Sequence, residues 1–212
     1  VKNFVIRHGY SSSVTVGGLQ TNLKGQADVN GNALERDQND NFYVARNVSN
    51  ITVSERFSPL IGVDATWNVN GQGLLTKFEV KKDRSSNLAL TNNQVTEIMG
   101  TEWVIGVGYK FPKVKLPIKF KDKNLQEPLN VRFDFSFRDN MTVIRKVEEN
   151  SNQGTAGQRV ISIKSSADYN IGQNLTIQLY YDQVINTPKI ASSYPTGNTS
   201  AGIRFRLNLA GI

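Results

Sequence analysis

Few side chains of this 212-residue chain have the type and spacing that catalysis requires. His8 is the only histidine and no Gly-x-Ser-x-Gly motif is present, so a Ser-His-Asp site has a single candidate base. We expect His8 to be a hydrogen-bonded strand residue. The acids Glu148 and Glu149 are sequence neighbours at a strand-to-loop junction, where their side chains diverge and form no catalytic pair. The sequence therefore predicts no enzyme.

Metal and nucleic-acid sites are equally poorly supported. The run Asp37–Asn41 begins like a calcium loop, but Phe42 replaces the required glycine and Val48 stands where a bidentate Glu is needed. The chain has no Cys, which excludes a disulfide scaffold, a Cys zinc site and a Cys nucleophile. We expect no cofactor.

The charge is basic but dispersed. With 25 Lys and Arg against 18 Asp and Glu, the formal net charge is +7. The densest basic run, from Lys110 to Lys123, fits a solvated strand or loop better than a phosphate-binding patch, because basic and acidic residues alternate elsewhere along the chain. No nucleic-acid partner is expected.

The dominant sequence pattern is a period of two. In Leu129–Arg138 every odd position is apolar and every even position is polar or charged. Such alternation places one side of a strand in an apolar medium and the other in water. The pattern recurs over 61–69, 103–111, 161–171, 175–182 and 201–209, and it is less regular over 12–19, 48–57, 74–82 and 141–147. No apolar run approaches the roughly 20 residues of a membrane helix.

Turn residues separate these runs. Asn70-Gly71, Asp139-Asn140 and Gly172-Gln173-Asn174 each favour a tight turn, so the pattern predicts antiparallel hairpins. Longer polar connections are expected near 22–41, 148–157 and 186–200. Short turns that alternate with long loops are typical of the two ends of an outer-membrane barrel.

Two all-β architectures produce this alternation. A soluble sandwich turns its apolar face into a core, whereas a membrane barrel turns that face to lipid and its polar face to a lumen. Three features favour antiparallel transmembrane β-barrel strands: runs of about 10 residues, charges in mid-strand, and aromatic residues near strand ends. The predicted end aromatics are Trp67, Trp103, Tyr109, Phe111, Tyr169 and Tyr181.

The barrel interpretation assigns side chains to two environments. The predicted lumen-facing residues are polar: Asp64, Thr66, Arg132, Asp134, Ser136, Lys164, Asp168, Gln178, Arg204 and Arg206. The predicted lipid-facing residues are apolar: Trp67, Trp103, Ile105, Val107, Val131, Phe133, Phe135, Phe137, Ile177, Leu179, Phe205 and Leu207.

Several strings carry a more specific resemblance. The segments are Tyr10–Ser13, Phe57–Asp64, Asn87–Gln94, Arg132–Asn140 followed by Thr142–Arg145, and Ser193–Thr199. In their number and chain order, these five segments resemble the C-terminal region of the SprA/Sov family. That family is the outer-membrane translocon of the type IX secretion system. The likeness is weakest over 25–41 and 112–128. It rests on strand and turn signatures, so it assigns no catalytic residue.

The resemblance implies a very large barrel in the bacterial outer membrane that exports folded cargo proteins and, in gliding bacteria, surface adhesins. It implies as partners the rest of the same barrel chain, a plug protein, a PorV-type shuttle barrel, a periplasmic prolyl isomerase, the secreted cargo and the lipid bilayer. Residues 1–212 are then an arc of a much larger barrel, and the last strand, 201–209, has one neighbour within this chain. The alternatives are a soluble or surface β-sandwich that binds a ligand, and a small autonomous porin-like barrel.

Overall fold

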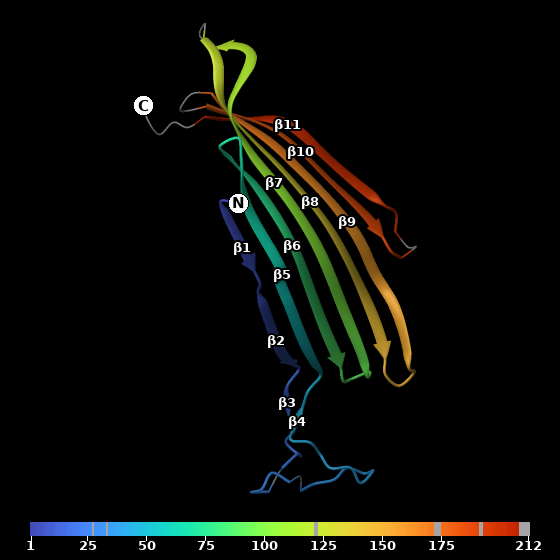
Figure 1. The fold of residues 1–212 in the computed structure, drawn as a ribbon. Coiled ribbons are helices and arrows are strands. Elements are labelled where there is room, and N and C mark those ends of the chain that lie inside the picture. Colours follow the sequence, from blue (N-terminus) through green and yellow to red (C-terminus); the bar gives the residue numbers. More distant parts are fainter. Residues whose placement is uncertain (27, 33, 121–122, 172–174, 191–192, 208–212) are drawn as a thin grey trace.

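A computed structural model describes residues 1–26, 28–32, 34–120, 123–171, 175–190 and 193–207, with the backbone alone for 116–120 and 123–126. Its secondary structure is entirely β over these residues (Figure 1). The strands are β1 (Asn3–Arg7), β2 (Tyr10–Gly17), β3 (Gln20–Thr21), β4 (Arg46–Asn47), β5 (Asn50–Val69), β6 (Gln72–Ala89), β7 (Gln94–Phe120), β8 (Lys123–Lys146), β9 (Ser151–Ile171), β10 (Leu175–Pro188) and β11 (Thr196–Leu207). Within the described part of the chain, no helix is long and apolar enough to cross a membrane.

Nine of the strands form one antiparallel sheet in the order β1-β5-β6-β7-β8-β9-β10-β11. The ninth, β2, follows β1 along the same edge of β5. From β5 onward each strand pairs with the next in sequence, so the strands lie side by side as a meander (Figure 1). The sheet is open: β11 pairs with β10 and not with β1 or β2. The expected single neighbour of the final strand is confirmed over residues 196–207.

The predicted turn at Asn70-Gly71 is confirmed. Val69 pairs with Gln72, so these two residues form the whole connection between β5 and β6. Asn70 has φ 50° and Gly71 has φ 79°, which is the left-handed geometry of a two-residue hairpin turn. The hairpin of β9 and β10 is also present, although its turn residues 172–174 lie outside the described residues.

Three predicted boundaries are wrong. Asp139-Asn140 does not form a turn, because both residues pair with β9 inside the continuous strand β8. The connection near 148–157 is a turn at 147–150, since residues 151–157 already belong to β9. The connection near 186–200 contains only residues 189–195 between β10 and β11. In all three places polar residues continue the strand, because each ladder supplies backbone partners regardless of side-chain polarity.

The central strands are far longer than the sequence pattern indicates. β7 has 27 residues and β8 has 24, whereas the alternating runs inside them cover 103–111 and 129–138. The less regular runs 48–57 and 141–147 are parts of β5 and β8 and not separate strands. Of the aromatic residues predicted near strand ends, Trp67 and Tyr169 lie there, whereas the prediction is wrong for four that lie inside β7 and β10: Trp103, Tyr109, Phe111 and Tyr181.

The sheet is a single layer, and almost nothing in it is buried. Of the described apolar residues only Ala65 and Tyr169 are buried, and no described side chain is fully enclosed. Tyr169 is shielded because its hydroxyl donates to the carbonyl of Val114 (3.0 Å) and accepts the N–H of Glu127 (3.1 Å), both from the β7–β8 hairpin. That hairpin projects past the sheet at one end, and the segment between β3 and β4 lies at the other (Figure 1).

Candidate functional site

The two faces of the sheet have different chemistry. In an antiparallel ladder, directly opposed residues point to the same side. The register places Trp67, Leu74, Tyr109 and Val131 in one row and extends that row to Ala167, Leu179 and Ile203. The side that carries this row is called the apolar face, and the opposite side is the polar face.

The central part of the apolar face is a continuous apolar band. Its members come from seven strands, and all of them are exposed or half-buried except Ala65 and Tyr169, which are buried. The apolar band consists of Ile61, Val63, Ala65, Trp67, Leu74, Phe78, Val80, Trp103, Ile105, Val107, Tyr109, Phe111, Leu129, Val131, Phe133, Phe135, Phe137, Ile161, Ile163, Ala167, Tyr169, Ile177, Leu179, Tyr181, Ile203, Phe205 and Leu207.

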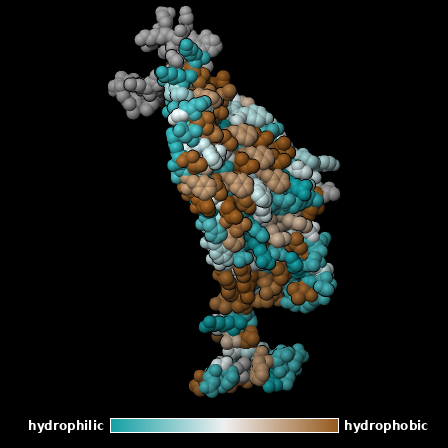
Figure 2. Space-filling view, in the orientation of Figure 1, coloured by the Kyte–Doolittle hydropathy of each residue, from teal (hydrophilic) through white to brown (hydrophobic). Residues whose placement is uncertain are grey.

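Measured along a strand, the apolar band has the length of a tilted membrane strand. Along β7 it runs from Trp103 to Phe111, nine residues, which is about 27 Å at about 3.4 Å per residue. A tilted membrane strand needs about 9–11 residues. Aromatic rings stand at both borders, with Trp103 and Phe137 at one and Tyr109 and Phe111 at the other. Figure 2 shows these apolar side chains gathered over the sheet and interrupted by hydrophilic ones.

Apart from Ala65 and from Tyr169, which the β7–β8 hairpin shields, the apolar band has no cover among the described residues. Phe133 is 42% exposed, Trp103 44% and Phe205 67%. Exposed apolar patches on soluble monomers rarely exceed a few hundred Å², and larger ones mark interaction surfaces. A band that crosses seven strands is a surface made for contact with an apolar medium or an apolar partner.

The polar face carries a row of alternating charge at mid-height. From β5 to β10 the paired residues of this row are, in order, Asp64, Lys77, Gly106, Asp134, Lys164 and Asp182. Opposite charges on neighbouring strands stabilise the pairing of a sheet. The row also gives the polar face charges of both signs at the same height.

An ion-pair network runs beside this row. The carboxylate of Glu79 is 5% exposed and lies 2.7 Å from Arg7, 3.3 Å from Lys77 and 3.7 Å from Lys81. Lys81 also reaches Glu102 at 3.7 Å. A carboxylate this enclosed needs its cationic partners, since an unpaired buried charge is costly.

The network continues onto β8. Arg138 contacts Glu102 at 3.8 Å and Asp83 at 2.9 Å. Five strands, β1, β5, β6, β7 and β8, are thus joined through charged groups on one face, because Arg7 also contacts Asp64 at 2.6 Å.

Two glycines of β7 leave room on the polar face. A side chain at Gly106 would meet the carboxylate of Asp134 at 2.7 Å, so glycine lets that carboxylate lie over the strand. Together with Gly108 it opens a shallow hollow of about 300 Å³ whose lining includes Asp64, Leu75 and Arg132.

Beyond the apolar band, the strands continue as a second region, here called the extension: residues 50–57, 82–89, 94–101, 139–146 and 151–159. On the apolar face of the extension, Glu97 is almost fully buried and is held by Arg84 at 2.5 Å and Arg145 at 2.7 Å. Burial alone would raise the pKa of Glu97, but the hydrogen bonds from Arg84 and Arg145 outweigh it and hold the pKa below its ordinary value.

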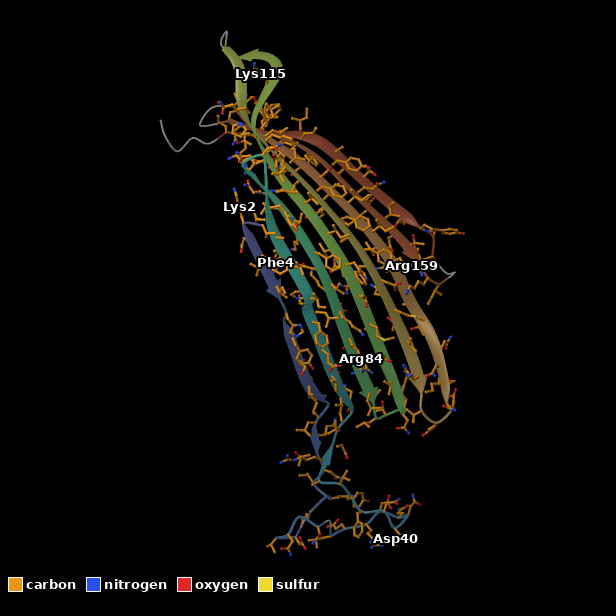
Figure 3. All side chains as sticks on the ribbon, viewed as in Figure 1. Lys2, Phe4, Asp40, Arg84, Lys115 and Arg159 are labelled. Carbon is orange, nitrogen blue, oxygen red and sulfur yellow. The ribbon has the colours of Figure 1, made fainter. Side chains whose placement is uncertain are left out.

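A second cluster lies where the extension meets the apolar band. The carboxylate of Asp139 accepts from Lys189 and from Arg159, the latter at 3.4 Å. The hydrogen bond from Lys189, assisted by Arg159, lowers the pKa of Asp139. Figure 3 labels Arg84 and Arg159, one in each of these clusters, on the side of the sheet that is seen there.

The register brings the predicted site residues together in two groups. All ten residues predicted to face the lumen lie on the polar face, and all twelve predicted to face lipid lie on the apolar face.

Sequence reasoning missed most of the charged groups that pair across strands. Lys77, Glu79, Lys81 and Asp83 alternate on β6, and this alternation of charge was a usable signal within a run that looked irregular. The cluster around Glu97 had no local signal, because its members come from three different strands.

The residues considered first for chemistry have structural roles. His8 lies at the break between β1 and β2, not in a strand, and its Nδ1 is 2.6 Å from the carbonyl oxygen of Leu60. The carboxylate of Asp37 accepts the backbone N–H groups of Asn39 and Asn41, which lowers its pKa.

The two adjacent acids have different partners. Glu148 accepts from Asn93, and Glu149 pairs with Lys146. Among the residues whose placement is described, no cluster of His, Asp or Glu could hold a metal ion.

Comparison with known proteins adds no relative. No protein-family model matches the chain, and a search of curated proteins finds no match. The functional argument therefore depends on the two faces and on the resemblance seen in the sequence.

Proposed function

We propose that this chain forms part of the wall of a large β-barrel in the bacterial outer membrane. The apolar band faces lipid, and the polar face lines a hydrated passage. The observation that carries this proposal is the apolar band itself: nine residues high, bordered by aromatic rings, uncovered, and backed by a charged face.

The polar face supports the same assignment. A sandwich would bury one face against a second sheet, and in the described residues the only other sheet is the two-stranded pair β3–β4. Charges such as Asp134 and Lys164 lie directly behind the apolar band, which suits a wall with lipid on one side and water on the other.

The open edges favour an arc over a small closed barrel. The backbone groups along β11 and along β1 and β2 have free sides, and lipid cannot satisfy them. Further strands of the same barrel would pair with both edges.

On the resemblance to the SprA/Sov family, we propose that the barrel is the protein-conducting translocon of the type IX secretion system. Its part in export is passive: the polar face bounds the route of folded cargo, and the gating and energy come from partner proteins. The plug, the PorV-type shuttle barrel and the prolyl isomerase belong to this proposal without assigned contact residues.

Single cysteines in the full-length protein test the orientation of the faces. In intact membranes, Cys at Phe135 should resist a water-soluble maleimide and should be quenched by lipid-borne quenchers. Cys at Asp134, one residue away on the polar face, should react and show no quenching. Equal quenching at both positions, or none at Phe135, would remove the membrane assignment.

Depletion of the full-length protein tests the transport role. Depleted cells should retain folded cargo in the periplasm, while other outer-membrane proteins still assemble. Normal delivery of cargo to the surface would contradict the translocon proposal and leave the barrel assignment intact.

A further inference from the structure

A row of cations borders the apolar band where the extension begins. On the apolar face, Lys82, Thr101, Asp139 and Arg159 follow one another across β6 to β9, one row beyond Trp103 and Phe137. Lys189 joins the row by its contact with Asp139. Three cations against one acid leave a local charge of 3 − 1 = +2.

These cations are accessible. The side chain of Arg159 is 60% exposed, and Lys82 is exposed. For Lys82, the structure shows no ion pair with any other described side chain. At the opposite border, the next paired residues of the same face on β8 to β10 are Glu127, Ile171 and Leu175, none of them basic, whereas β7 continues into Lys113 and Lys115 of the projecting hairpin.

The connections orient the sheet in the proposed membrane. At the end with the cation row, the connection between β2 and β5 spans residues 18–49, and two hairpins extend beyond the apolar band over 82–101 and 139–159. The other end has the two-residue turn Asn70-Gly71 and one projecting hairpin, that of β7 and β8 (Figure 1). Outer-membrane barrels have short periplasmic turns and longer extracellular loops. The cation row therefore lies at the level of the outer-leaflet headgroups.

Building on the proposed function, we infer that Lys82 and Arg159 bind phosphate groups of the phosphorylated glycolipid in the outer leaflet, the lipid A portion of lipopolysaccharide. The apolar band contacts the acyl chains, and the guanidinium of Arg159 matches the geometry of a phosphate. Asp139 positions Arg159 and neutralises only one of its two cationic neighbours.

The test uses the purified full-length protein and measures its affinity for bisphosphorylated lipid A by native mass spectrometry. Each cation near an anionic lipid surface contributes about 1 kcal/mol, so the double variant Lys82→Gln with Arg159→Gln should bind roughly 20-fold more weakly. The matched control is Lys110→Gln with Arg206→Gln, which removes the same charge from the polar face and should change affinity less than about twofold.

Dephosphorylated lipid A distinguishes phosphate recognition from acyl-chain contact, and it should bind the unchanged protein as weakly as phosphorylated lipid A binds the double variant. Where the double variant assembles poorly, the single variant Lys82→Gln should still weaken binding about fivefold. Unchanged affinity in these variants, or equal binding of both lipids, would overturn the inference. The cysteine pattern at Phe135 and Asp134 would still hold in that case, so failure here is distinct from failure of the membrane assignment.

Discussion

The apolar band and the extension are two regions of the same strands that differ on the same face, which is almost wholly apolar in the band and a mixture of apolar and charged residues in the extension. On β8, residues 129–137 present Leu, Val and three Phe side chains to the apolar face, whereas Asp139, Met141, Val143 and Arg145 follow on that face within a few residues. The backbone ladder is continuous through the change. The change in side chains therefore reflects a change of surroundings and not a break in the fold.

The two regions also use different interactions for stability. In the apolar band the side chains have no covering layer among the described residues, so their stabilisation depends on the medium. In the extension, ion pairs such as Arg84–Glu97–Arg145 link β6, β7 and β8 directly. On the proposed membrane assignment, lipid stabilises the apolar band, whereas the extension has ion pairs of its own that hold in water.

The largest expected effect comes from a charge placed in the apolar band. Phe135→Arg should cost roughly 2–4 kcal/mol, because it places a cation at the bilayer midplane. Met141→Arg, on the same strand and face but in the extension, should cost less than about 1 kcal/mol, since that side chain is 37% exposed beyond the apolar band. The measurement is the amount of full-length protein assembled in the outer membrane. Similar losses for both variants would erase the distinction between the two regions.

An intermediate effect is expected from the ion-pair cluster of the extension. Glu97→Ala should destabilise the extension by about 1–2 kcal/mol, because it leaves Arg145 and Arg84 facing each other with only the longer contact of Arg84 to Glu55, at 3.9 Å. The cost stays in this range because both arginine side chains are about half exposed and screened by solvent.

Hydrogen exchange of the full-length protein would measure this effect. Faster exchange is expected over 84–97 and 143–146, with the apolar band unchanged. Glu148→Ala, in the nearby exposed turn, should stay within about 0.5 kcal/mol. Equal effects of the two substitutions would show that Glu97 has no special role.

The smallest expected effect is acid weakening of the extension. The folded-state pKa of Glu97 lies below its ordinary value, so its ionised form contributes stability above the ordinary Glu pKa of about 4.3. That contribution is lost as pH falls through the lowered pKa. Asp139, whose pKa is also lowered, should act in the same direction near its own ordinary value of about 3.9.

The acid effect separates the two regions again. Below about pH 4 the protection factors in the extension, which are corrected for the intrinsic exchange rate at each pH, should fall while those of the apolar band stay unchanged. In Glu97→Gln the fall over 84–97 should be largely absent. A fall that starts in the apolar band would contradict the assignment of ion-pair stability to the extension.

The extent of the strands was the main failure of sequence reasoning. Apolar and polar side chains alternate along a strand only where its two faces meet different media. The sequence pattern therefore predicts the strand segments 103–111 and 129–138 but not the rest of β7 and β8. In the extension both faces carry polar residues, and the period of two disappears although the strand continues. Because Asp139 and Asn140 are both polar, the sequence pattern predicts a turn there, whereas both residues pair with β9 inside β8.

By itself the sequence determined which side chains share a face and where one hairpin turns. Period-two alternation is a local property of an extended backbone, so Phe133 and Phe135 had to point one way and Arg132 and Asp134 the other. Asn70-Gly71 adopts its left-handed turn for equally local reasons. Only the tertiary structure decided how far the strands extend, that the sheet stays open, and which charges meet. Glu79 pairs with Arg7 on β1 as well as with lysines of its own strand, and Glu97 pairs with Arg84 on β6 and Arg145 on β8. These pairs depend on the cross-strand register, which is set by the whole ladder and not by any neighbouring residue.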